Sequence, residues 1–286
     1  MSLKTTLMMQ HIAAFSIGDS GGNPAGVVLC ETLPDPAEMQ AVAAEAGYSE
    51  SVFAAPAEGA WRARYFAPKF EVDFCGHATI ALGAALARQS GPGVFDLVLN
   101  RAHITVEGEW SPTHCAATFR SPPTRSGGVS VAVLDEVLAL FGLSHDQLDS
   151  RLPPAIANAG GDHLILALRD RAALRDMRYD FSAGRALAER EGLVTFNLVH
   201  VETPSLFHAR NPFPLGGVYE DPATGSAAAA LAGYLRDRDW PHSGHIVILQ
   251  GEDMGAHCRI EAAISPTCGD GVRVSGAARF LRASAA

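Results

Sequence analysis

Hydrophobic and polar positions follow two different periods along this chain of 286 residues. Apolar side chains alternate with polar ones from Trp61 to Phe66, which is the pattern of a half-buried strand. Between Pro36 and Gly47 apolar residues recur at helical spacing, and a glycine is a typical helix stop. Similar patterns predict strands at residues 94–99, 104–106, 115–119, 164–168 and 194–201, and helices at residues 134–141 and 185–191. Strands and helices therefore mix throughout, which predicts an α/β (α+β) fold.

One predicted helix, from Gly76 to about Arg88, has an uncommon composition. It is rich in Ala and Gly and carries almost no charge. A helix that is apolar on every face is normally buried on all sides. We therefore expect this helix to lie inside a sheet.

The same pattern returns in the second half of the chain. When Gly76 is aligned with Gly225, Ala and Leu positions of the two helices coincide, and an Arg, a Phe and a Pro precede both helices. The offset is 149 residues (225 minus 76), close to half of the 286 residues. This spacing favours a tandem duplication.

The length also favours two domains, because a single core is uncommon beyond about 250–300 residues. Pro122-Pro123 is the predicted boundary. We expect an N-terminal half at residues 1–121 and a C-terminal half at residues 122–276. The strand at residues 277–286 is a candidate to complete the N-terminal half.

Composition and charge exclude several classes of function. The formal net charge is −9, and Lys and Arg form no basic patch, so no nucleic-acid partner is expected. No run is long and apolar enough for a membrane span. The five cysteines form no C-x-x-C pair, which favours a reducing cytoplasm and neither disulfides nor a cysteine zinc site. His242 and His245 lack further ligands nearby, so no metal is expected, and no nucleotide-binding glycine motif occurs.

The two glycine-started helices are the first candidates for chemistry. A helix N-terminus presents unpaired N–H groups and partial positive charge, which suit a carboxylate or an enolate. Gly76 and Gly225 would let a ligand approach closely, Ser226 adds a hydroxyl, and His77 can relay a proton. We expect the active site where the N-termini, or mouths, of these two helices face each other. Two glycines that serve only helix packing would explain the same pattern.

Three other residues have both a functional and a structural interpretation. Asp221 can hold a substrate hydroxyl or amine, or simply cap the second helix. Glu50 precedes an apolar strand, where burial would raise its pKa into the acid/base range, or it lies in an exposed loop. Cys75 can be an acidified nucleophile or a buried inert thiol. A two-thiol racemase would need a second cysteine, and residues 221–226 contain none.

Several motifs together resemble one family, the phenazine-biosynthesis PhzF-like isomerases. The resemblance spans nearly the whole chain, and its most specific string is the sequence E-D-P-A-T-G-S-A at residues 220–227. The other matching segments are residues 22–25, 49–53, 64–68, 71–72, 75–79, 250–255 and 274–276. Departures occur at residues 13–16 and at Ala67, away from the matched catalytic positions, and at residues 256–258, where the change would alter the edge of the pocket or nothing.

This resemblance implies a diaminopimelate-epimerase-like fold and a reaction. The fold would have two pseudo-symmetric domains, each a curved, mostly antiparallel sheet wrapped around a central helix, usually in a homodimer. The activity would be cofactor-free proton transfer on a small anionic metabolite, with Glu50 as the acid/base. His77, Asp221 and Ser226 match the family's other site residues.

Two rival functions remain at this point. The first is a thiol-dependent amino-acid racemase or epimerase that uses Cys75. The second is a non-catalytic metabolite-binding protein on the same fold.

Overall fold

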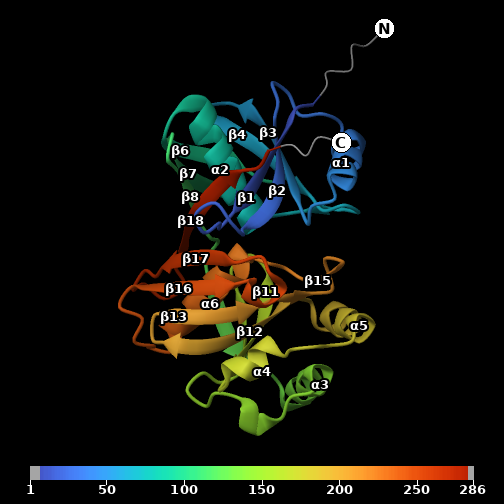
Figure 1. The fold of residues 1–286 in the computed structure, drawn as a ribbon, viewed down its shortest axis with the longest axis vertical. Coiled ribbons are helices and arrows are strands. Elements are labelled where there is room, and N and C mark those ends of the chain that lie inside the picture. Colours follow the sequence, from blue (N-terminus) through green and yellow to red (C-terminus); the bar gives the residue numbers. More distant parts are fainter. Residues whose placement is uncertain (1–6, 283–286) are drawn as a thin grey trace. The chain divides into compact units, whose positions relative to one another are not determined.

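The structure is a computed structural model that describes residues 7–282 and divides into two compact units (Figure 1). Unit 1 combines the chain up to Phe119 with the segment from Gly276, and unit 2 comprises Arg120–Ser275. Residues 1–6 and 283–286, which the predicted domain ranges include, lie outside the described part. Within residues 7–282, every helix is too short or too polar to span a bilayer.

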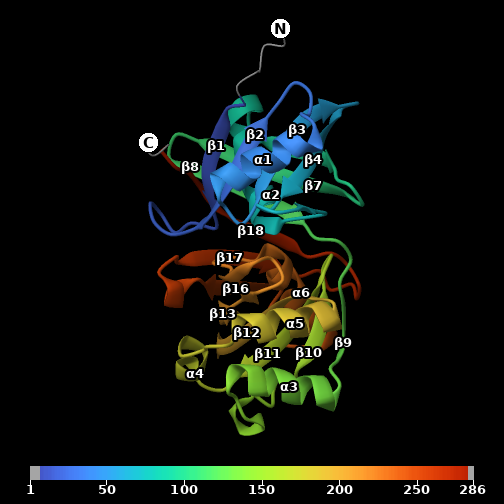
Figure 2. The same ribbon diagram turned by 90° about the vertical axis from the view of Figure 1, so that its right-hand side faces the viewer.

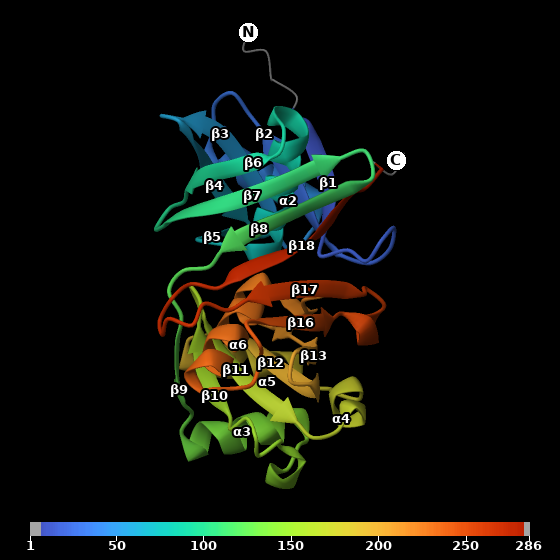
Figure 3. The ribbon, with the colours of Figure 1, turned by 90° about the vertical axis from the view of Figure 1, so that its left-hand side faces the viewer.

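The strands of unit 1 form a sheet that closes on itself. Their order is β1-β2-β3-β4-β6-β7-β8-β18, and β18 also pairs with β1. Figure 3 shows β6, β7 and β8 as adjacent strands of this sheet. The strands are β1 (Met9–Ala14), β2 (Asn23–Leu29), β3 (Ser51–Ala57), β4 (Ala60–Phe66), β5 (Glu71–Val72, paired with β4), β6 (Gly93–Val98), β7 (His103–Ser111), β8 (His114–Arg120) and β18 (Arg273–Phe280), of which Arg120 and Arg273–Ser275 belong to unit 2.

Helix α2 (Gly76–Ser90) is enclosed by these strands, as its composition predicts. Every residue from Gly76 to Ala87 is buried. Helix and sheet approach closely because both contribute glycine: a Cβ added at Gly108 of β7 would lie 2.3 Å from the carbonyl oxygen of Gly83. Helix α1 (Pro36–Ala46) packs outside the sheet, where Met39 joins Phe53 and Phe66 in a smaller core (Figure 2).

The sheet of unit 2 is open, with the order β17-β16-β13-β12-β11-β10-β9, and Arg273–Ser275 at the start of β18 pair with β17. Its strands are β9 (Arg125–Gly128), β10 (Ala155–Asn158), β11 (Asp162–Leu168), β12 (Leu193–Thr203), β13 (Leu206–Arg210), β16 (His245–Gln250) and β17 (Cys258–Ala263), and β14 (Pro212–Phe213) pairs with β15 (Val218–Glu220) apart from it. Its helices are α3 (Val131–Phe141), α4 (Arg171–Arg175), α5 (Phe181–Glu191) and α6 (Gly225–Asp237), with short 3-10 turns η1 (His145–Gln147) and η2 (Glu252–Met254).

Both faces of this open sheet are covered. Helix α6 contacts β9, β10, β11, β16 and β17, so the sheet curves around it as the closed sheet surrounds α2. Helices α3 and α5 form the main core of unit 2 with alternate residues of β11 and β12, including Leu166 and Phe196. Because side chains alternate across a strand, α3 and α5 cover the face opposite α6.

The aligned arginines of the two halves make the same contact. Arg64 donates from Nε and Nη2 to the two carboxylate oxygens of Glu71, at 2.8 and 2.6 Å. Arg210 donates to the Glu220 carboxylate from the same two nitrogens, and its Nε lies 3.0 Å from Oε1. The aligned arginines therefore have the same structural role in both halves, which agrees with two pseudo-symmetric halves.

Candidate active site

The first turn of α2 is fixed from two sides in unit 1. Its N-cap position is Cys75, which has extended backbone and makes no side-chain cap bond. The hydroxyl of Thr79 donates to the carbonyl of Cys75 at 2.7 Å, and the phenol of Tyr65 from β4 lies 2.8 Å from the same hydroxyl. The backbone N–H of Thr79 donates to the same carbonyl at 3.0 Å, so backbone and side-chain bonds together fix Cys75 at the start of the helix.

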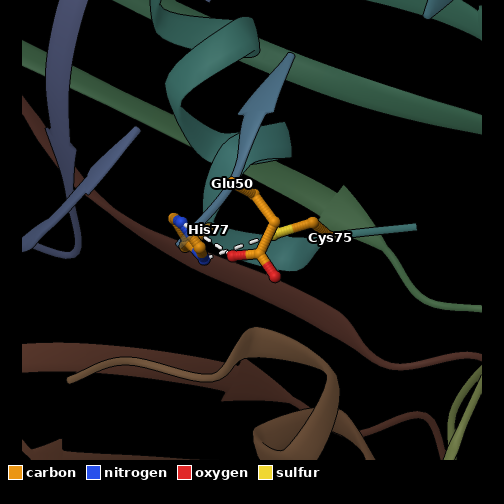
Figure 4. A group of neighbouring side chains, drawn as sticks. All are labelled: Glu50, Cys75 and His77. Carbon is orange, nitrogen blue, oxygen red and sulfur yellow. Dashed lines mark hydrogen bonds and ion pairs between the residues drawn. The ribbon is translucent and has the colours of Figure 1, made fainter. Parts of the chain in front are cut away.

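Glu50, Cys75 and His77 lie together at this turn, all buried (Figure 4). Glu50 directly precedes β3, and His77 is the second residue of α2. The Nδ1 of His77 lies 3.2 Å from Sγ of Cys75. Its Nε2 lies 3.4 Å from Oγ of Ser49 and 3.7 Å from Oε2 of Glu50. The imidazole thus contacts both the thiol and the carboxyl group, and the thiol also hydrogen-bonds the carboxyl group directly.

Burial controls the protonation of this cluster. Desolvation raises the pKa of Glu50 above its usual range, and hydrogen bonds from Ser49 and Cys75 offset part of that rise. Desolvation also lowers the pKa of His77 from 6.5 to about 3. Although His77 and Glu50 are close enough for an ion pair, His77 is neutral at pH 7, so their contact is dipolar. Glu50 consequently keeps its proton to a higher pH than an exposed glutamate does.

The same three residues also have the donor types of a metal site. Their ligand atoms lie within 4.8 Å of one another. However, the thiol contacts Nδ1 of His77 whereas the carboxyl group lies on the Nε2 side. The thiol also hydrogen-bonds Glu50, so the contacts among the three side chains form a hydrogen-bonded cluster.

The start of α6 in unit 2 is built differently. Asp221 accepts a hydrogen bond from the Thr224 hydroxyl at 2.6 Å. The side-chain amide of Gln250, at the end of β16, donates to the Asp221 carbonyl at 2.7 Å and accepts from the Thr224 N–H at 3.3 Å. Gly225 is the buried first residue of α6, and Ser226 is half-buried. The start of α6 is therefore a hydrogen-bonded loop, and within residues 7–282 the acid–thiol–imidazole cluster lies at the start of α2 alone.

The structure bears on two interpretations made from the sequence. Thr224, not Asp221, is the N-cap residue of α6, and it makes no side-chain cap bond, so the capping interpretation of Asp221 is wrong. Cys75 is buried, as one of its two interpretations expected, and its sulfur contacts His77. In each case the side chain bonds to a neighbouring side chain, a choice that spacing alone does not determine.

Sequence reasoning did not assign roles to two residues that support this mouth. Gln250 lies within a matched segment, but only the structure links it to Asp221 and Thr224. Arg210 forms an ion pair with Glu220, the residue before Asp221, and also donates to the carbonyl of Arg175 at 2.8 Å. The alignment of Arg210 with Arg64 was the available signal for this role.

Known proteins resemble this chain over nearly its full length. Residues 12–283 match the model of a family described as phenazine biosynthesis-like protein. A protein of Deinococcus radiodurans named an uncharacterized isomerase is 32% identical, over 95% of this chain and 92% of its own. The structure of a predicted epimerase from Pseudomonas aeruginosa matches with a TM-score of 0.85 and 25% identity, over 97% of this chain and 98% of that one.

A more distant likeness concerns the fold alone. A hydroxyproline epimerase from Agrobacterium vitis superimposes with a TM-score of 0.66 at 11% identity, covering 99% of this chain and 92% of its own. These matches confirm the fold class that the resemblance implied. The chain is an isomerase and belongs to the phenazine biosynthesis-like protein family.

Proposed function

We propose that this isomerase moves a proton between carbon atoms of a small carboxylate-bearing metabolite, without a cofactor and with Glu50 as the single acid/base. The observation that carries the proposal is the buried Glu50 carboxyl group, whose pKa is raised by desolvation while His77 stays neutral beside it. A general acid/base works best when its pKa lies near the operating pH. An ordinary exposed glutamate would be too weak a base at pH 7.

The reaction balances with one carboxyl group. Ionised Glu50 takes a proton from a carbon of the substrate, and the electron pair of that C–H bond delocalises into the adjacent unsaturated system. Protonated Glu50 then returns the proton to a different carbon, where that pair forms the new C–H bond. Neutral His77 and Asp221 orient the substrate and stabilise the delocalised anion.

The helix mouths supply the binding groups in this proposal. The first N–H groups of α2 around Gly76, and those of α6 around Gly225 and Ser226, are donors for substrate carboxylate oxygens. Asp221 is held by Thr224 and Gln250, so one of its carboxylate oxygens has a fixed direction. A rigid acceptor of this kind suits a substrate hydroxyl or amine.

The test begins with a ligand. Carboxylate metabolites are screened for thermal stabilisation, since a ligand at 100 times its Kd adds about 2.7 kcal/mol. Compounds that bind are then incubated with the protein in D₂O, and deuterium incorporation is followed by NMR. Wild type should incorporate deuterium, whereas Glu50→Gln should lose about 10²–10⁴-fold of the exchange rate.

Glu31→Gln is the matched control, because Glu31 is exposed and lies outside the cluster. It should exchange like wild type. Undiminished exchange in Glu50→Gln would remove Glu50 from the base role. Binding without any exchange in the wild type would reject the proton-transfer reaction itself.

A thiol-dependent racemase is a second candidate, favoured by the contact between Cys75 and His77. It needs a second acid/base on the opposite side of the substrate. The position aligned with Cys75 in the other half is Thr224, whose hydroxyl donates to Asp221. A hydroxyl group is far less acidic than a thiol, so the single-base reaction is favoured. The racemase predicts that Cys75→Ala and Cys75→Ser both abolish exchange.

A further inference from the structure

Cys75 has a place in the cluster that the single-base reaction leaves unused. It is 8% exposed, and its sulfur lies 3.2 Å from Nδ1 of His77. Its thiol also hydrogen-bonds the Glu50 side chain. One thiol therefore contacts both the base and the imidazole beside it.

A thiol has a single proton to donate. In neutral His77 with its proton on Nε2, the lone pair of Nδ1 accepts a hydrogen bond from sulfur. The ionised Glu50 carboxylate also accepts one, and a charged acceptor binds a donor more strongly than a neutral one. The S–H bond can turn from one acceptor to the other without transferring its proton.

We propose that Cys75 is a positioning residue whose S–H donates to Glu50 when that carboxyl group is ionised and to Nδ1 of His77 when it is protonated. The inference rests on the proposed function, because it concerns the two states through which Glu50 cycles. The thiol stabilises the carboxylate that removes the proton, and it turns back to the imidazole while Glu50 carries that proton. Cys75 thus supports both states and touches neither proton transfer directly.

The surroundings give the thiol few competitors. Within the described residues, the polar groups that face Glu50 are Ser49, its neighbour in the chain, and Cys75 and His77 from the start of α2. Tyr65 from β4 lies close to Cys75, but burial raises the pKa of its phenol, so it is uncharged at neutral pH. Ionisation of Glu50 is therefore the charge change to which the thiol responds.

The experiment compares Cys75→Ala with Cys75→Ser in the full-length protein. Alanine removes the donor, whereas serine keeps a hydroxyl donor in a similar volume. The rate of substrate deuterium exchange is measured against pH, with Glu50 titrated independently by carboxyl NMR. In Cys75→Ala, the acidic limb of the rate profile and the Glu50 titration should both move upward by about one pH unit, a tenfold change in ionisation constant. In Cys75→Ser they should stay near wild type.

The other outcomes are distinct. A uniform loss of rate in Cys75→Ala with an unmoved Glu50 titration would overturn the positioning role and leave a purely structural one. Abolished exchange in both variants would overturn it in favour of the thiol-dependent racemase. If the proposed function fails, Glu50→Gln still exchanges, and the NMR titration of Glu50 in the Cys75 variants tests the hydrogen bond without any substrate.

Discussion

The two helices that start with glycine have the same position in their halves but different surroundings. At the start of α2, an acid, a thiol and an imidazole are buried together, and two of them have pKa values shifted by desolvation. At the start of α6, Asp221, Thr224 and Gln250 bond to one another in a loop. The two similar halves therefore carry different groups: a buried cluster with shifted pKa values at the start of α2, and a hydrogen-bonded polar loop at the start of α6. Symmetry of the fold does not carry over to the chemistry.

The supporting residues differ in the same way. The Arg210 and Glu220 side chains are 6% and 3% exposed, whereas those of Arg64 and Glu71 are 18% and 25% exposed. Desolvated partners depend far more on each other than solvated ones do. The loop that carries Asp221 thus rests on a buried ion pair, and the α2 mouth does not.

The largest expected effect comes from breaking these ion pairs. Arg210→Ala leaves the Glu220 carboxylate buried without its partner, and should lower the free energy of unfolding by about 3–5 kcal/mol. Arg64→Ala, the matched change in the other half, should cost about 1 kcal/mol or less, because water replaces the lost partner. Urea unfolding measures both. Equal losses would show that the two halves are not as different as their exposures indicate.

The titrating cluster should make stability depend on pH. Because the His77 pKa falls from 6.5 to about 3 on folding, the unfolded state binds more protons between these values. Folding stability is therefore full above pH 6.5 and is lost as the pH falls toward about 3, with a slope approaching about 1.4 kcal/mol per pH unit. The raised pKa of Glu50 acts in the opposite sense, since its stability is lost as the pH rises.

Urea unfolding of wild type and His77→Asn at several pH values separates the two contributions. The difference between them should shrink as the pH falls below 6.5, because the variant has no imidazole to titrate. His103→Asn, a change at an exposed histidine, should reproduce the wild-type profile. A difference that does not change with pH would mean that His77 is not held neutral by burial.

The smallest effect concerns one pair of aligned core positions. Tyr65 follows Arg64 and bonds to Thr79, whereas Asn211 follows Arg210, is fully buried, and has neither amide atom hydrogen-bonded within the described residues. Tyr65→Phe should destabilise unit 1 by about 1 kcal/mol. Asn211→Leu should be neutral or stabilise by about 1 kcal/mol, because an unpaired buried amide is lost. Thermal unfolding of both variants checks the signs, and a clear loss in Asn211→Leu would reveal a partner for the amide.

Much of the frame could be predicted from the sequence. The strand and helix periods, the buried character of α2, the offset of 149 residues (225 minus 76) and the E-D-P-A-T-G-S-A string all depend on local order along the chain. The helix starts indicated Gly76, His77, Gly225 and Ser226 as candidates, and the family resemblance implied roles for Glu50 and Asp221. Their roles in substrate binding and catalysis remain proposals for the experiments above.

Other features depended on which side chains meet. Glu50 and Cys75 are 25 residues apart (75 minus 50), and only the packing of β3 against α2 decides that one is buried against the other. The link between Gln250 and Asp221 likewise spans 29 residues. The sequence alone determined the repeated glycine-started helices, because periodicity and composition set local structure. The tertiary structure decided which helix start holds the titrating cluster, because desolvation and hydrogen bonding depend on neighbours that are distant along the chain.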